Sequence, residues 1–182
     1  MKNKTQELTL IGISTAVLIL MAQLAIPMPS GVPVTLQTFG ISLIAFILGA
    51  KRAGIATVIY IVLGAIGLPV FSAFSGGMGS LFGLTGGFIL GFLPMSIITG
   101  LGNNLGNKVG NKIISLVFGL LGLFVCHLFG ASQYAILSGI DIFASLMAVS
   151  IPYLVKDIIV LVMAKVIAET VVFALKKAKI NL

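Results

Sequence analysis

Four charged side chains, Lys156, Asp157, Lys165 and Glu169, lie within one apolar stretch near the end of the sequence, IPYLVKDIIVLVMAKVIAETVVFAL (residues 151–175). An ionisable group inside a bilayer costs about 2.5–3.5 kcal/mol by insertion scales, so such groups are candidates for function. Adjacent Lys156 and Asp157 could bind the two ends of a small amphiphile, or could form an ion pair that reaches interfacial water. Lys165 and Glu169 are spaced i,i+4 and can pair on one helix face, as a structural pair, a partner-facing pair or an ion relay.

A second candidate is the glycine-rich stretch FSAFSGGMGSLFGLTGGF (71–88), which holds six glycines and no charged residue. Glycine allows a backbone to approach a ligand closely. The stretch lacks the Lys-Ser/Thr ending of a phosphate-binding loop, so it indicates no ATP hydrolysis. We interpret it, with the uncharged segment MPSGVPVTLQTFG (28–40), as part of the walls or lid of a pocket. The alternative is two ordinary connecting turns.

The sequence contains no catalytic constellation. His127 and Cys126 are neighbours, but adjacent helical residues point about 100° apart. One histidine with one cysteine is also too few ligands for a zinc site. We interpret His127 as a helix-end histidine with a local hydrogen bond, and we expect neither an enzyme, nor a metal site, nor a cofactor.

The composition predicts an integral membrane protein made of helices. The chain has 182 residues, of which 59% are hydrophobic and 8% charged, with a mean hydropathy of +1.23. Soluble domains have about 25% charged residues. The net charge of +7 does not indicate nucleic-acid binding, because the basic residues form short clusters between apolar runs and no basic face.

The positions of the basic residues predict the topology. Six apolar runs are visible, each of roughly spanning length: 8–27, 36–50, 54–72, 87–101, 113–130 and 152–175. Outside the runs, basic residues occur only before the first run, in alternate connections and after the last, namely Lys2, Lys4, Lys51, Arg52, Lys108, Lys112, Lys176, Lys177 and Lys179. Since basic residues stay on the cytoplasmic side, we predict an all-α integral membrane protein with six transmembrane helices and both termini cytoplasmic. We expect one domain over residues 1–182, and we interpret 131–150 as an outer-side helix or re-entrant piece.

The first run is expected to remain as a helix, because no cleavage site follows it. It contains Gly12 and Ala16, a pair of small residues four apart that allows a partner helix to pack closely.

Three blocks of the sequence resemble one family. They are PSGVPVTLQTFG (29–40), YIVLGAIGLPVFSAFSGGMGSLFGLTGGFILGF (60–92) and IPYLVKDII (151–159). Their order and spacing resemble the BioY family, the biotin-binding S components of energy-coupling-factor (ECF) transporters, over essentially the whole chain. The resemblance implies six helices, cytoplasmic termini and a biotin site near the outer face of a prokaryotic plasma membrane. It also implies partners: a transmembrane coupling subunit and two cytoplasmic ATPase subunits.

The resemblance also implies site residues. Asp157 would recognise the ureido group of biotin, and Ser75 would give a hydrogen bond from the glycine-rich loop. The other expected ligand contacts are loop glycines, two polar residues and three aromatic rings: Gly76, Gly77, Gly79, Gln37, Thr35, Phe88, Tyr153 and Phe71.

The chain departs from the family pattern at three positions. Val160 stands where the family usually has lysine, Lys156 stands where it has glycine, and Leu84 replaces a proline. Residues four apart share nearly the same helix face, so we hypothesise that Lys156 supplies the missing cation. Other readings stay open: an S component for another vitamin, a stand-alone channel or ion-coupled carrier, or a structural subunit that binds no small molecule.

Overall fold

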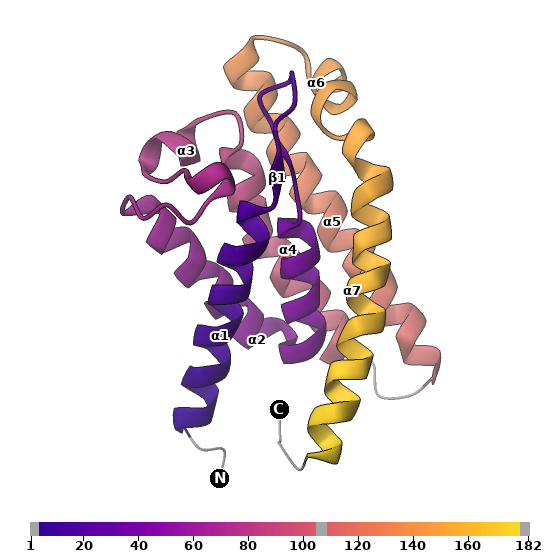
Figure 1. Ribbon diagram of the computed structural model, residues 1–182. Coiled ribbons are helices and arrows are strands. Elements are labelled where there is room, and N and C mark those ends of the chain that lie inside the picture. Colours follow the sequence, from indigo (N-terminus) through magenta and orange to yellow (C-terminus); the bar gives the residue numbers. More distant parts are fainter. Residues whose placement is uncertain (1–3, 105–108, 179–182) are drawn as a thin grey trace.

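The computed structural model describes residues 4–104 and 109–178, and helices dominate it (Figure 1). The prediction of an all-α protein is therefore confirmed. The only strands in these ranges form a two-stranded antiparallel hairpin, β1 (Ala25–Ile26) with β2 (Val34–Thr35). In chain order the helices are α1 (Lys4–Gln23), α2 (Gln37–Ala65), the short 3₁₀ helix η1 (Ser72–Phe74), α3 (Met78–Phe82), α4 (Gly86–Asn104), α5 (Val109–Ser138), α6 (Ile142–Val149) and α7 (Ile151–Lys177).

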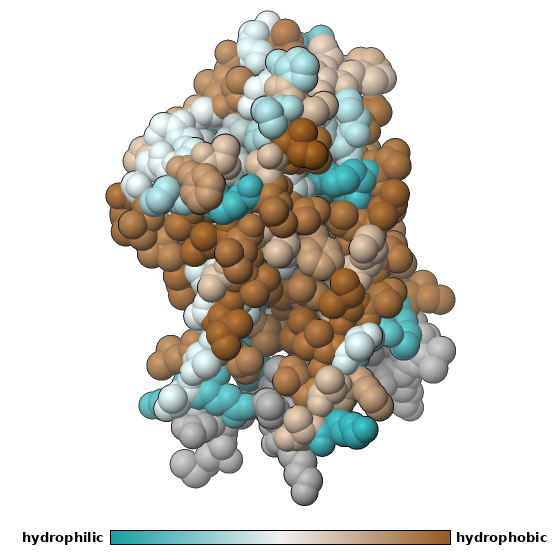
Figure 2. All heavy atoms as spheres, in the orientation of Figure 1, coloured by the Kyte–Doolittle hydropathy of each residue, from teal (hydrophilic) through white to brown (hydrophobic). Residues whose placement is uncertain are grey.

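Four of the described helices are long and apolar enough to cross a membrane, namely α1, α2, α5 from Lys112 onward, and α7. A shorter apolar helix covers Gly86–Gly102. Figure 2 shows hydrophobic residues around the middle of the molecule and hydrophilic residues gathered toward its two ends. The arrangement fits a protein surrounded by lipid at its waist.

Helix α2 contains both the second and the third predicted runs. Its helical geometry is broken at Gly49, where φ is 76° and ψ is 175°, a conformation that glycine adopts readily. Figure 1 shows α2 as two parts that run in different directions. We expected Lys51 and Arg52 in the connection between the second and third runs, and this is wrong, since both belong to the helix. The helix covers the third run only as far as Ala65.

The segment 131–150 also differs from its prediction. Its first eight residues continue α5 to Ser138, and only Ile142–Val149 form a separate short helix. Asp141 begins that helix, because its carboxylate accepts hydrogen bonds from the backbone N–H groups of Phe143 (2.9 Å) and Ala144 (3.0 Å). The ionisable residue in this segment thus caps a helix.

Glycines allow α4 and α5 to pack with their backbones close together. A Cβ atom at Gly91 would lie 3.0 Å from the Cα of Cys126, and one at Gly122 would lie 2.9 Å from the carbonyl oxygen of Met95. Real Cβ atoms rarely approach so closely, so a larger residue would separate the helices. This contact fixes the middle of α5 against α4.

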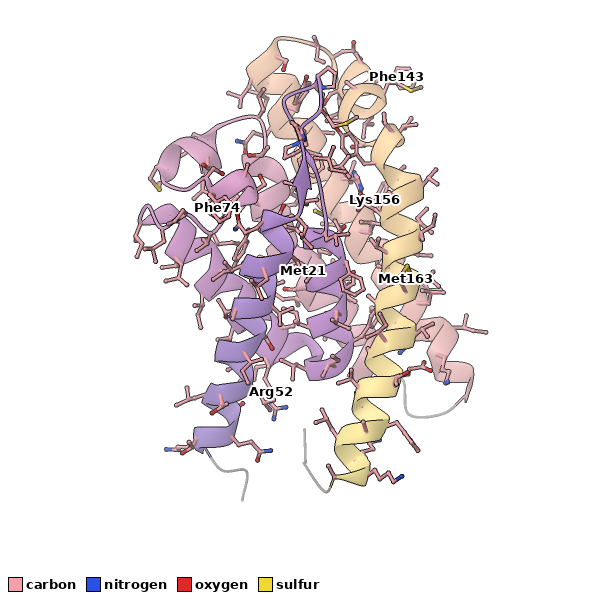
Figure 3. The ribbon with its side chains drawn as sticks, viewed as in Figure 1. Met21, Arg52, Phe74, Phe143, Lys156 and Met163 are labelled. Atoms are coloured by element: carbon pink, nitrogen blue, oxygen red, sulfur yellow. The ribbon has the colours of Figure 1, made fainter. Side chains whose placement is uncertain are left out.

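Helix α1 begins and α7 ends at the same end of the molecule (Figure 1), and Lys4, Lys176 and Lys177 belong to these two helix ends. Arg52, labelled near this end in Figure 3, pairs with Glu7 through Nε and Oε1 at 3.3 Å. Lys112 pairs with Glu169 at 2.7 Å. Of the predicted basic clusters, Lys2, Lys108 and Lys179 lie outside the described residues.

Candidate functional site

The β1–β2 hairpin is attached to the far end of the bundle by two tyrosines. Tyr153 of α7 donates a hydrogen bond to the carbonyl of Val32 (2.7 Å), and its hydroxyl lies 2.9 Å from Ser30 Oγ. Tyr134 of α5 donates to the carbonyl of Ser30 (3.1 Å). The tip turns at Gly31, whose φ of 78° favours glycine. The hairpin is therefore held against both α5 and α7.

A cavity of about 50 Å³ lies beneath the hairpin. It is bounded by the hairpin, the start of α2, both ends of the glycine-rich stretch, α4, α5, α6 and α7. Its lining residues are Val32, Pro33, Thr35, Gln37, Thr38, Ser72, Thr85, Phe88, Ile89, Phe92, Cys126, His127, Val149, Tyr153, Lys156 and Asp157. We call this the pocket.

The carboxylate of Asp157 is the centre of the polar side of the pocket. Asp157 is only 3% exposed. Its Oδ1 lies 2.5 Å from Lys156 Nζ and accepts a hydrogen bond of 2.5 Å from Thr38 Oγ1, while its Oδ2 lies 3.2 Å from His127 Nε2. Three groups from α7, α2 and α5 thus converge on one buried carboxylate, which is how a buried charge is tolerated.

Lys156 joins this carboxylate to the hairpin. Its Nζ donates a hydrogen bond to the carbonyl of Thr35 at 2.8 Å, and Figure 3 shows the side chain between α7 and the hairpin. Binding of the two ends of an amphiphile would require Lys156 and Asp157 to lie apart. The two side chains are in contact and form one charged site. Nor does Asp157 belong to an ion pair that reaches interfacial water, because its side chain is buried.

The interpretation of His127 as a helix-end residue with a local hydrogen bond is wrong. It lies inside α5, is 4% exposed and lines the pocket. Its ring meets that of Phe88 edge-on, with centroids 5.7 Å apart. Within the described part of the chain neither ring nitrogen makes a well-aligned hydrogen bond, despite the proximity of Asp157. The signal in the sequence was a lone histidine within an apolar helix.

The apolar part of the pocket wall includes two phenylalanines, Phe88 and Phe92. A Cβ atom at Gly130 of α5 would lie 2.4 Å from three carbons of the Phe88 ring. The ring therefore has its place only because residue 130 carries no side chain. Cys126, also on this wall, is buried and free.

Thr35 and Gln37 are held in place by hydrogen bonds within the protein. Thr35 Oγ1 donates to Gln37 Oε1 (2.8 Å), and Gln37 Nε2 donates to the hydroxyl of Tyr60 (2.7 Å). Both residues are buried and line the pocket. The structure thus brings six of the expected ligand contacts together, namely Asp157, Lys156, Thr35, Gln37, Phe88 and Tyr153.

Five other expected contacts do not line the pocket. Ser75 is exposed, and Gly79 has open space where a Cβ would lie. Gly76 packs against the carbonyl of Leu68, and the N–H of Gly77 donates to the carbonyl of Gly64 at 2.6 Å. The fifth, Phe71, is fully buried with its ring edge-on to Tyr60 at 5.4 Å.

Two glutamines instead direct the ends of the glycine-rich stretch toward the pocket. Gln23 of α1 accepts a hydrogen bond from the N–H of Phe74 (2.9 Å) and donates to the carbonyls of Val70 and Phe71 (both 3.3 Å). Gln133 of α5 donates to the carbonyls of Leu81 and Gly83, both at 2.8 Å. Ser72 and Thr85, close to these attachment points, line the pocket and were not predicted to do so.

The pair Lys165 and Glu169 forms as predicted, with 3.8 Å between Nζ and Oε1. Lys165 also donates to Ser115 Oγ (3.0 Å) and lies 5.0 Å from the centre of the Phe46 ring. Glu169 is shared with Lys112. None of these residues lines the pocket.

Gly12 and Ala16 lie on the exposed face of α1, with nothing within 4 Å of a Cβ placed at Gly12. A close approach of another helix is sterically possible there. No group of three or more His, Cys, Asp or Glu side chains that could hold a metal ion occurs among residues 4–104 and 109–178.

A bundle of apolar helices whose buried polar groups converge on a small cavity near one end defines a membrane protein that binds a small molecule. The BioY family model matches residues 1–177, and the chain belongs to that family.

Individual relatives agree with this assignment. The probable biotin transporter BioY of Pyrococcus horikoshii is 34% identical over 166 residues, covering 91% of this chain and 96% of the relative. The biotin transporter BioY of Thermotoga maritima is 35% identical over 163 residues, covering 90% and 94%. A crystal structure of the S-component for biotin from an ECF-type ABC transporter matches with a TM-score of 0.82 and 29% identity over 94% of each chain. The expected family is thus confirmed, and with it the expectation of a transport protein and not an enzyme.

Proposed function

We propose that this chain is the biotin-capturing S component of an ECF-type uptake transporter. One observation carries the proposal: in a member of the BioY family, a buried carboxylate, Asp157, meets polar groups from three helices in a pocket whose wall has both polar and apolar parts. Biotin needs such a combination, because its ureido group has N–H donors and a carbonyl acceptor, whereas its thioether ring is apolar.

The polar groups suit the ureido ring in detail. Asp157 accepts a hydrogen bond from one ureido N–H group, while Lys156 donates to the ureido carbonyl as the cation that Val160 cannot supply. His127 and Gln37 offer further polar contacts, and Thr35 supports Gln37.

The apolar contacts come from aromatic side chains. The rings of Phe88 and Tyr153 pack on the bicyclic part of biotin. The proposed roles of Phe71, Ser75, Gly76, Gly77 and Gly79 stay predictions, and the loop residues among them reach a ligand only when their segment moves inward.

Binding requires the cover of the pocket to move. Its volume of about 50 Å³ is smaller than the roughly 300–1,000 Å³ of ordinary small-molecule sites. The hairpin and the glycine-rich stretch form the cover, and side-chain hydrogen bonds of Tyr153, Gln23 and Gln133 hold them. These bonds are the ones that admission of biotin would alter.

The proposal includes the topology. We infer six crossings, made by α1, the two parts of α2 on either side of Gly49, α4, α5 and α7, within one domain of residues 1–182. The basic end, with both termini, faces the cytoplasm of a prokaryotic cell, and the pocket faces outward across the plasma membrane.

The chain contains no ATP-binding motif that we recognise, so the energy for uptake must come from elsewhere. We propose the ECF coupling subunit and two cytoplasmic ATPase subunits as partners, with membrane lipid around the bundle. The exposed pair Gly12 and Ala16 offers the coupling subunit a surface for close helix packing.

Equilibrium binding of biotin to the purified chain in lipid nanodiscs tests the proposal. We expect tight, saturable binding that other vitamins do not compete for, and that needs no ion gradient. Binding of another vitamin in place of biotin would change the substrate assigned to the pocket. Biotin accumulation driven by an ion gradient in vesicles without ATPase subunits would favour the carrier alternative.

A further inference from the structure

A second cavity lies between the second part of α2 and α4. Its volume is about 580 Å³, and it shares no lining residue with the pocket. Apart from one lysine, every side chain that lines it is apolar or absent. We call it the groove.

Small residues explain why the groove exists. Gly100 lets α4 approach α2 so closely that a Cβ there would lie 2.3 Å from the backbone nitrogen of Ala50. One turn further along α2, Gly54 leaves a depression beside Ile97, where a Cβ would meet the Ile97 side chain at 3.2 Å. Outward-facing Ile55 and Val58 form its rim, and both are partly exposed.

The one ionisable group of the groove is Lys51, at the end nearest the turn at Gly49. Lys51 is exposed and makes no hydrogen bond or ion pair with any residue in the described ranges. Its neighbour Arg52 has the opposite environment, since it is buried and paired with Glu7. Of two consecutive cations, one is therefore neutralised within the protein and the other is left at the mouth of an apolar groove.

The dimensions of the groove match one leaflet of a bilayer. Its α2 wall runs from Lys51 to Ile59, which at a rise of 1.5 Å per residue is about 12 Å. Half of a hydrocarbon core is about 15 Å. A cation at the basic end and an apolar surface of this length are complementary to an anionic headgroup with its acyl chain. A docking helix, about 10–12 Å across, would instead need a wider face.

We infer that the groove is a binding site for a phospholipid with an anionic headgroup, whose phosphate contacts Lys51 and whose acyl chain lies along Gly54 and Val58. Basic positions between transmembrane helices bind such headgroups, and one lysine near the surface is worth about a fivefold preference. This site does not depend on biotin binding, so the two proposals can fail separately.

Native mass spectrometry of the purified chain tests the inference, with phosphatidylglycerol and phosphatidylcholine of identical chains added in turn. We expect about fivefold stronger retention of phosphatidylglycerol. Lys51→Gln should abolish the preference, whereas Lys176→Gln, which removes an exposed lysine away from the groove, should keep it. Equal retention of the two lipids by the wild type, or an unchanged preference in Lys51→Gln, would overturn the inference.

The apolar part of the site has its own test. Val58→Trp fills the groove from its exposed rim and should reduce retention of both lipids, with folding checked by thermal denaturation. A photo-reactive residue at position 58, activated in native membranes, should gain the mass of a phospholipid. An adduct with a polypeptide, either a partner or a second copy of this chain, would overturn the inference and assign the groove to a protein interface.

Discussion

Helix α7 carries two clusters of ionisable side chains, and they differ in burial and in what surrounds them. In the first, Asp157 is 3% exposed, contacts groups from three helices and borders the pocket. In the second, the side chains of Glu169 and Lys112 are 37% and 59% exposed, and no member lines the pocket. The sequence shows similar residues in both, so charge within an apolar helix does not by itself define a site.

The two clusters also differ in what removal of one member should cost. A buried carboxylate that loses its charge leaves its partners uncompensated in a medium that solvates them poorly, at about 3–5 kcal/mol. An exposed ion pair contributes about 0–1 kcal/mol. Substitutions in the first cluster should therefore change function strongly, and those in the second should change stability slightly.

The largest effect is expected for Asp157→Asn. The neutral amide accepts a hydrogen bond from a ureido N–H more weakly than a carboxylate does, and it leaves the ammonium of Lys156 without its counter-ion. We expect the dissociation constant of biotin to rise by at least about 100-fold, measured by isothermal titration calorimetry. An affinity within a few-fold of the wild type, in folded protein, would move biotin away from this carboxylate.

A smaller effect, about tenfold, is expected for Lys156→Met, which keeps the length of the side chain but removes a charge-assisted hydrogen bond. The loss should be the same for biotin and for biotin methyl ester, because the proposed partner is the ureido carbonyl. Adding Val160→Lys, one turn along the same face, should restore part of the affinity. Unchanged affinity in Lys156→Met would sink the hypothesis that this residue supplies the cation.

For His127→Gln we expect a loss of about two- to tenfold, the range of one neutral hydrogen bond. The amide keeps a donor but loses the edge contact with Phe88. Competition binding with labelled biotin is sensitive enough to measure this change. A loss as large as that of Asp157→Asn would show that the histidine is a principal contact and not a supporting one.

The smallest effect is expected for Glu169→Gln, the matched control on the same helix. Biotin affinity should stay within about twofold, and the free energy of unfolding should fall by no more than about 1 kcal/mol. Binding and thermal denaturation of the same preparation check both statements. A large loss of biotin affinity would show that the second cluster takes part in binding, and the two clusters would then not differ in function.

The family and six of the expected pocket residues could be predicted because their signals are local. Asp157 and Lys156 stand out as charges in an apolar run, and the segment containing Thr35 and Gln37 is uncharged and rich in turn residues. The break of α2 was harder to foresee. A single glycine with positive φ replaces the loop that two adjacent bases suggested.

The remaining site residues depend on contacts between distant parts of the chain. His127 lines the pocket because glycines fix the rotation of α5 against α4, which no local pattern reveals. In the glycine-rich stretch, Ala73 and Phe74 adopt positive φ values of 53° and 57°, and Gln23 from α1 holds the N–H of Phe74 there. The sequence of this glycine-rich stretch reveals neither these backbone conformations nor the hydrogen bond to Gln23. For that reason Ser75 was expected at the pocket in place of Ser72.

The contact between Phe88 and Gly130 has an evolutionary consequence. Any residue larger than glycine at position 130 forces the aromatic ring of Phe88 to shift, because a Cβ there would lie 2.4 Å from it. The ring forms part of the pocket wall, whereas residue 130 does not line the pocket. The size of the molecule that the pocket accepts thus depends partly on a residue behind the pocket wall. A single codon change there can alter selectivity while every residue that contacts the ligand stays the same.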